Sequence, residues 1–259
     1  VHASKAWRAW VYLLLIALAE FLTLINPYLG LGLHAVLLIS LIIQGSWGQP
    51  GPEQNLLLSL TLAPLLRLLS FSLPLTKFPQ LLWYPLVMLP IMGATWITAR
   101  LLRLPPAALG LRMDNWWLQL MAAPTGLAIG VAEYLILKPG PIISGDSWGG
   151  YALAALLLAV LAGFGEELVF RGLILPLAHS SMKWRGIIFV SLLFAALHIG
   201  YNSPVGLLLA FLVGILFALL AHESWSILGV SLAHGMANVT LFLVMPYIAH
   251  APSYRTITN

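Results

Sequence analysis

The sequence predicts an all-α protein, a polytopic bundle of transmembrane helices. The first observation is composition, because 61% of the 259 residues are hydrophobic and only 8% are charged, whereas soluble domains carry about 25% charged residues. The second is a mean hydropathy of +0.96. The third is that the apolar residues form long successive segments. Backbone groups in hydrocarbon must be paired within such a segment, so the segments form helices, whereas a membrane barrel would show short alternating strands.

Nine apolar segments are candidates to cross a bilayer, which takes about 20 residues in a helix. Several are short for a crossing, so the sequence predicts about eight membrane helices and leaves nine as the alternative. Stretches rich in Pro and Gly separate the segments, and the longest of them runs from Lys138 to Gly150. The candidate segments are 9–25, 29–44, 54–73, 80–102, 115–137, 150–175, 186–200, 204–221 and 226–249.

The charged residues indicate a membrane topology rather than a charged partner. The formal net charge is +4, but the basic residues form no stripe, so we expect no nucleic acid partner. Cytoplasmic loops are enriched in Lys and Arg, which with nine spans places the N-terminus inside. The inside group is then Lys5, Arg8, Arg100, Arg103, Arg112, Lys183 and Arg185, and the outside group is Lys77, Lys138 and Arg255. The chain has no cysteine, which excludes disulfides, thiolate metal ligands and a cysteine nucleophile.

Two adjacent carboxylates and an arginine lie within the apolar segment 150–175. A charged side chain inside a span costs about 2.5–3.5 kcal/mol on insertion scales and persists when it pairs or has a function. Glu167 and Arg171 are four residues apart, so they share a helix face and we expect them to pair. Glu166 points about 100° away from Glu167. We therefore expect Glu166 to face the bundle interior without that arginine.

Two later segments carry further polar groups at mid-span. His198 lies in the first of them, and His234 and Asn238 share a helix face in the second. A carboxylate shielded from water can act as a general base, and imidazole and amide N–H groups can stabilise an oxyanion. These are the groups that peptide-bond hydrolysis needs. Glu166, His198 and His234 could instead bind one zinc ion with an open position for water, and the sequence does not decide between the two.

The three motifs resemble the CPBP family, which includes the type II CAAX prenyl endopeptidases and the bacterial Abi proteins. The family pattern is Glu-Glu-x-x-x-Arg, then Phe-x-x-x-His, then His-x-x-x-Asn, on successive membrane helices. All three are intact and in order, as Glu166-Glu167-x-x-x-Arg171, Phe194-x-x-x-His198 and His234-x-x-x-Asn238. We therefore divide the chain into N-terminal membrane helices at 1–104 and a CAAX protease/Abi-like catalytic membrane core at 105–250, within one bundle.

The resemblance implies an intramembrane endopeptidase with about eight helices around a central cavity. In that role Glu166 and His198 would activate a water, and His234 and Asn238 would form the oxyanion site. The second glutamate and the arginine of the first motif would hold their helix in register. The family has been described both as a glutamate-type protease, which requires no cofactor, and as metal-dependent. We favour the first, with zinc at Glu166, His198 and His234 as the alternative.

Two other functions stay open, as does the substrate. A proton-coupled transporter also uses buried Glu and His relays, although the inverted repeats of many transporters are not visible. The other is a non-catalytic membrane protein that binds a peptide, such as an immunity protein. We expect membrane lipid and a peptide or protein substrate, lipidated or not, as partners. We expect the bacterial plasma membrane as the location, because the chain shows no targeting extension.

The remaining polar residues within apolar segments are interpreted as structural. Glu20, His34 and Glu133 are interpreted as polar contacts or span-end residues. His222 and the glutamate after it begin a zinc-protease motif, but its second histidine is missing. These residues therefore carry no predicted chemistry.

Overall fold

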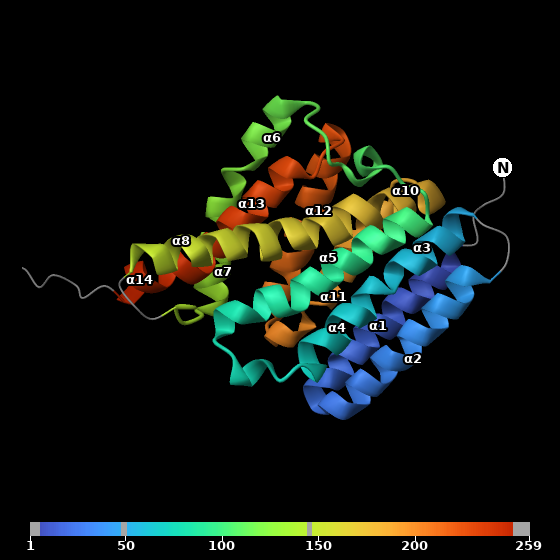
Figure 1. The fold of residues 1–259 in the computed structure, drawn as a ribbon, viewed down its shortest axis with the longest axis horizontal. Helices are drawn as coiled ribbons and strands as arrows, with labels where there is room; N and C mark the ends of the chain where they lie inside the picture. The colour runs from blue at the N-terminus through green and yellow to red at the C-terminus, as the bar shows by residue number, and fades with distance from the viewer. Residues whose placement is uncertain (1–5, 48–50, 144–146, 251–259) are drawn as a thin grey trace, which may run out of the picture.

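The computed structural model describes residues 6–47, 51–143 and 147–250, and within these ranges the chain is helical with no β-strand (Figure 1). The predicted all-α class is therefore confirmed. Lys5 and Arg255, which the topology prediction uses, lie outside the described residues. The predicted orientation in the membrane stays a prediction.

Eight helical runs of the described chain are long and apolar enough to cross a membrane. The ninth predicted segment, Arg185–Tyr201, is also helical and apolar but shorter than the other eight. The described residues thus favour eight full-length spans over nine. The eight runs are Trp7–Ile25, Pro27–Ser46, Pro52–Ser72, Gln80–Leu101, Trp116–Leu137, Trp148–Met182, Pro204–Ser224 and Leu228–Ala249.

The N-terminal helices form a bundle at one side of the molecule (Figure 1). The turn between α1 and α2 is built by Asn26, whose side chain accepts hydrogen bonds from two backbone N–H groups of the next helix, and by Pro27 in its first turn. Two short 3₁₀ turns, η1 and η2, then lead into α5. The bounds are α1 Trp7–Ile25, α2 Pro27–Ser46, α3 Pro52–Leu60, α4 Leu62–Ser72, η1 Leu75–Lys77, η2 Gln80–Leu82 and α5 Trp83–Leu101.

One long helical run from Trp148 to Met182 passes through the middle of the bundle (Figure 1). Two π-helical stretches, η4 and η5, flank a short α-helical turn that holds both glutamates, and π-helical turns are frequent at functional sites. The predicted segment ends at residue 175, but the helical run continues through Pro176 to Met182. The parts are α8 Trp148–Leu157, η4 Leu158–Phe164, α9 Gly165–Glu167, η5 Leu168–Ile174 and α10 Leu175–Met182.

The remaining helices complete the bundle around this run. Helix α13 packs against both η4 and α7, while α1 packs against α11 and α3 packs against α10. The N-terminal and C-terminal helices are thus in contact, and the predicted boundary between 1–104 and 105–250 stays a prediction. The bounds are η3 Pro106–Leu109, α6 Trp116–Ala122, α7 Thr125–Leu137, α11 Arg185–Ala196, η6 Ile199–Tyr201, α12 Pro204–Ser224, α13 Leu228–Val239, η7 Thr240–Val244 and α14 Met245–His250.

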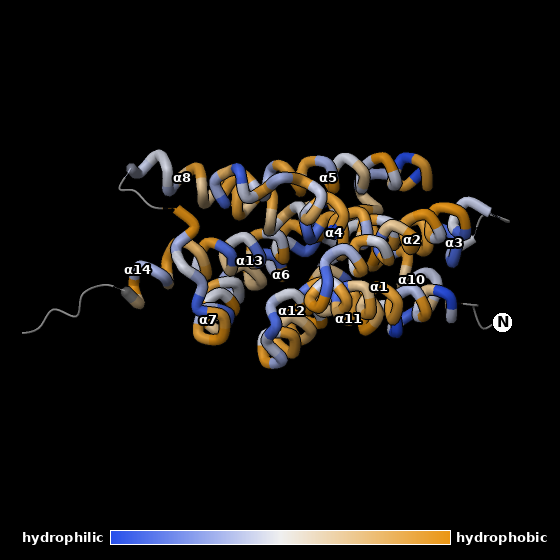
Figure 2. The backbone as a smooth tube through the Cα atoms, turned by 90° about the horizontal axis from the view of Figure 1, so that it is seen from below, coloured by the Kyte–Doolittle hydropathy of each residue, from blue (hydrophilic) through white to orange (hydrophobic). Residues whose placement is uncertain are grey.

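The outer surface of the bundle is apolar, as a lipid-facing surface requires. Figure 2 shows apolar residues running along the outward-facing turns of the helices. Exposed tryptophans lie at helix ends, among them Trp47, Trp148 and Trp184. Tryptophan is enriched at the level of lipid head groups, and the position of these residues at helix ends suits that level.

Candidate active site

Four side chains from three helical runs meet in one cavity. Glu166 comes from α9, His198 directly precedes η6, and His234 and Asn238 come from α13. All four line a cavity of about 100 Å³, called the central cavity below. The structure thus brings the predicted site residues together, and what each one does there stays a prediction.

Glu167 is completely buried and holds two partners. Its Oε1 accepts a hydrogen bond from Arg171 Nη1 at 2.9 Å and another from His234 Nδ1 at 2.8 Å. Arg171 also donates to the carbonyl of Gly214 at 3.2 Å and lies 4.6 Å from the centre of the Phe194 ring. The predicted pairing of Glu167 with Arg171 is confirmed. The pair also joins the helix of the two glutamates to the helix that carries His234.

The ring of His198 is oriented by the end of α11. Its Nδ1 lies 2.7 Å from the carbonyl oxygen of Phe194. A carbonyl can only accept, so Nδ1 carries the hydrogen and Nε2 of the neutral ring presents a lone pair. The backbone beside it is held from the N-terminal helices, because Arg67 donates to the Leu197 carbonyl at 2.8 Å and to Glu20 Oε1 at 2.8 Å. His198 is therefore fixed through both its ring and its backbone.

His234 and Asn238 lie one turn apart on α13. With Nδ1 of His234 donating to Glu167, its other ring nitrogen lies 3.9 Å from Glu166 Oε2. The Nδ2 of Asn238 is buried and has no hydrogen-bond partner among the described residues. A buried donor without a partner at a cavity wall is suited to bind an oxygen that arrives with a ligand.

Close glycine contacts set the position of α13. A Cβ at Gly163 of η4 would lie 2.6 Å from the backbone nitrogen of Gly235, and a Cβ at Gly130 of α7 would lie 2.5 Å from the carbonyl oxygen of Ala237. Small residues allow the backbones of membrane helices to approach closely. The helix that carries His234 is therefore held between α7 and η4.

Sequence reasoning misses three further polar residues of the central cavity. Tyr84 of α5, Glu133 of α7 and Tyr201 of η6 lie in its wall. The interpretation of Glu133 as a span-end residue does not place it beside Glu166, where the structure does. A signal was present, because Glu133 follows Gly130 by three residues on a helix whose glycines face a neighbouring helix.

The zinc alternative requires Glu166, His198 and His234 to converge on a single ion. Among the described residues, no three His, Asp or Glu side chains are grouped as the ligands of one metal ion would be. The arrangement does not fit a zinc site built from these three residues, so the chemistry below contains no metal step.

Comparison with known proteins finds a match for part of the chain. A family model described as "Rce1-like: Type II CAAX prenyl endopeptidase Rce1-like" matches residues 148–240. This range contains all three motifs, and the match is consistent with the resemblance to the CPBP family. No curated protein and no solved structure matches the chain.

Proposed function

We propose that the chain is an intramembrane endopeptidase. The proposal starts from two findings: the chain is a multi-pass membrane protein, and its residues 148–240 match the model of the Rce1-like type II CAAX prenyl endopeptidases. One observation carries the proposal, namely that a carboxylate, two imidazoles and a primary amide line the same small cavity inside the helix bundle. A general base and oxyanion donors in one cavity are what hydrolysis of a peptide bond requires.

The reaction follows from the hydrogen bonds around the cavity. A water gives its proton to the Glu166 carboxylate as its oxygen attacks the carbonyl carbon of the scissile bond, and His198 Nε2 orients that water by accepting its second hydrogen. Asn238 Nδ2–H donates to the resulting oxyanion, and Nε2–H of His234 does so when that ring is protonated. The proton on Glu166 then passes to the leaving nitrogen as the C–N bond breaks, which restores the carboxylate.

An apolar cleft supports delivery of the substrate from the membrane. It has a volume of about 630 Å³, lies between α4 and α5, and is lined by Phe71, Trp83, Tyr84 and Glu166, with aliphatic residues around them. Tyr84 and Glu166 also line the central cavity. A peptide with an apolar or lipidated segment in this cleft would place its backbone next to Glu166. Membrane lipid, a lipid-associated peptide and the bacterial plasma membrane remain the proposed partners and location.

The test is removal of the Glu166 carboxylate. New peptide termini are compared in membranes that contain the wild type, Glu166→Gln, or the control Glu223→Gln, which alters an exposed carboxylate on α12. We expect Glu166→Gln to slow cleavage by about 10²–10⁴-fold, because it removes the general base. Gln has nearly the volume of Glu, so the variant should insert and elute in gel filtration like the wild type.

The same variant separates the alternatives. Wild-type cleavage by folded Glu166→Gln would exclude the proposed role of this carboxylate. A Glu166-dependent proton flux in sealed vesicles without peptide products would favour the transporter. A biological effect that survives Glu166→Gln would favour the non-catalytic peptide-binding protein.

A further inference from the structure

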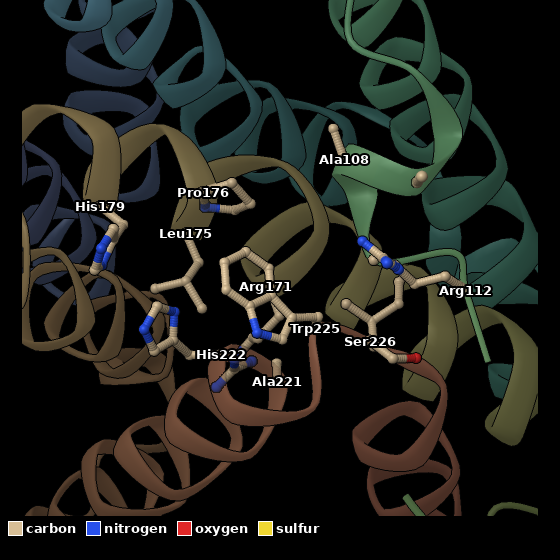
Figure 3. Close-up of a pocket in the computed structure, with 13 residues that line it drawn as sticks. Ala108, Arg112, Arg171, Leu175, Pro176, His179, Ala221, His222, Trp225 and Ser226 are labelled. Carbon is tan, nitrogen blue, oxygen red and sulfur yellow. The ribbon is translucent and has the colours of Figure 1, made fainter. Parts of the chain in front are cut away.

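A second cavity lies where α10 and α12 end, away from the four residues of the central cavity. It has a volume of about 350 Å³ and is called the basic cavity below. Four basic side chains contribute to its wall, and no carboxylate is among the described residues that line it. The four are Arg112, Arg171, His179 and His222 (Figure 3).

Two nitrogen atoms of this wall are buried without a hydrogen-bond partner among the described residues. They are Nε of Arg171 and Nδ1 of His179. Arg171 is only 2% exposed, and its two terminal nitrogens already donate to Glu167 and to the Gly214 carbonyl. A guanidinium cannot lose its proton, so Nε–H remains a donor that needs an acceptor. Buried polar groups of this kind indicate a bound water or ion.

The basic groups lie around the cavity rather than along one helix. His179 and His222 lie side by side, with ring centres 4.6 Å apart, and Arg112 lies on the other side of Trp225 (Figure 3). Arg112 pairs with Asp114, whose side chain is 45% exposed. Because a guanidinium has five N–H donors, this pair at the rim leaves donors of Arg112 for a ligand. An anion in the cavity would therefore meet donors from two directions.

The position of the basic cavity and the apolar residues of its wall indicate which kind of molecule would carry an anion into it. Trp225 lines the cavity and is 63% exposed, as is typical of a side chain at the level of lipid head groups. Leu175, Pro176 and Ile227 make much of the remaining wall apolar. Basic pockets between transmembrane helices are suited to the head groups of anionic lipids.

We infer that the basic cavity binds the phosphate group of an anionic phospholipid, with the glycerol and the start of an acyl chain against its apolar wall. The basic cavity contains none of the four proposed catalytic residues, although it shares Arg171 with the buried pair that also holds His234, and lipid binding does not depend on hydrolysis. The measurement can therefore also be made on Glu166→Gln, so that failure of one proposal does not affect the other.

The test measures lipid bound to the purified full chain by native mass spectrometry. Phosphatidylglycerol and phosphatidylcholine are offered separately, and inorganic phosphate is added in excess as a competitor. We expect the wild type to hold phosphatidylglycerol about tenfold more tightly than phosphatidylcholine, because both carry a phosphate but only the first has a net negative charge. Inorganic phosphate should displace little of it, since it lacks the apolar contacts.

Variants assign the binding to this cavity. His179→Leu combined with His222→Leu should weaken phosphatidylglycerol binding by about tenfold, because it removes two donors from the wall. Arg185→Gln, an exposed basic residue near the end of α10 that is not part of the cavity wall, should change binding by less than about twofold. If the double histidine variant does not fold, Arg112→Gln takes its place, with binding expected to be at least about threefold weaker.

Three outcomes would overturn the inference. Equal binding of both lipids by the wild type would mean that the cavity does not recognise the anion. Wild-type binding by a folded variant of the cavity would place the lipid elsewhere on the surface. Displacement of the lipid by inorganic phosphate would show that the site takes a free anion instead.

Discussion

At the scale of single residues, Glu166 and Glu167 are neighbours in the chain with opposite surroundings. Glu167 has no exposed side-chain surface and lies between Arg171 and His234, whereas the side chain of Glu166 keeps 25% of its surface exposed. The spacing of the motif explains this division, because only Glu167 lies four residues before Arg171. One carboxylate is therefore enclosed between partners inside the bundle, and the other stays partly exposed at the central cavity.

This division predicts different effects of the same substitution on stability. Glu167→Gln should lower the free energy of unfolding by about 3–5 kcal/mol, because the buried guanidinium of Arg171 loses its counter-charge. Glu166→Gln should change it by less than about 1 kcal/mol. Both variants can be unfolded from mild detergent with sodium dodecyl sulfate and followed by circular dichroism. Equal unfolding midpoints for the two variants would contradict the separate roles.

The site residues could be predicted as a set, but their contacts could not. Glu166, His198 and His234 are conspicuous because each is polar within an otherwise apolar segment. The bond between His234 and Glu167 joins residues 67 positions apart on two helices. Sequence spacing fixes which residues share a face of one helix but not how two helices are rotated against each other. The same limit conceals Glu133 in the wall of the central cavity.

At the scale of elements, the position of α13 depends on contacts between helix backbones that leave no space for a Cβ atom. Gly163 faces Gly235 across the contact between η4 and α13, so the two backbones touch. His234 and Asn238 lie on either side of Gly235 along α13. The distance between these two helices therefore sets the distance between Glu166 and the predicted oxyanion donors.

A methyl group at this contact should separate the two helices. Gly163→Ala is expected to lower stability by about 1–3 kcal/mol through overpacking and to reduce cleavage, because His234 and Asn238 move away with α13. The matched control is Gly93→Ala on α5, where a Cβ would meet no atom within 4 Å. That control should keep full activity and stability, since Ala favours helix over Gly by about 0.5–1 kcal/mol. Cleavage by Gly163→Ala at the wild-type rate would show that the close contact is not needed.

The elements could largely be predicted, because each span is a continuous apolar run bounded by Pro, Gly or charged residues. The π-helical stretches on either side of Gly165–Glu167 could not. A run that is apolar on nearly all sides has the same composition whether its backbone bonds are α-helical or π-helical. Packing against neighbouring helices decides between the two, and that information is not local.

At the scale of the whole molecule, a buried ionic chain connects the N-terminal helices to the backbone beside His198. Arg67 of α4 bridges Glu20 of α1 and the Leu197 carbonyl. His34 of α2 lies against the same carboxylate, with Nε2 3.4 Å from Glu20 Oε1. The expected polar contact is thus confirmed for Glu20, whereas neither ring nitrogen of buried His34 has a hydrogen-bond partner among the described residues. These helices lie outside residues 148–240, yet they hold the loop on which one of the two predicted water-activating groups lies.

The effect of the Glu20–Arg67 pair on His198 can be separated from its effect on stability by removing both charges together. Arg67→Met alone should destabilise the protein by about 3–5 kcal/mol, because it leaves Glu20 buried and unpaired, whereas Glu20→Gln with Arg67→Met should recover much of that loss. Cleavage should nevertheless stay about tenfold or more below wild type in the double variant, because the Leu197 carbonyl lacks its donor and a small misplacement of a catalytic group is costly.

The chain supplies its own control for that experiment. Arg8 and Glu53 form a comparable pair between α1 and α3, at 2.7 Å, and neither residue lines the central cavity. Arg8→Met with Glu53→Gln should therefore leave the cleavage rate unchanged at similar stability. If the Glu20 and Arg67 double variant also cleaves at the wild-type rate, the N-terminal helices do not position His198. If only that variant loses activity, the predicted catalytic core depends on helices that none of its three motifs reveals.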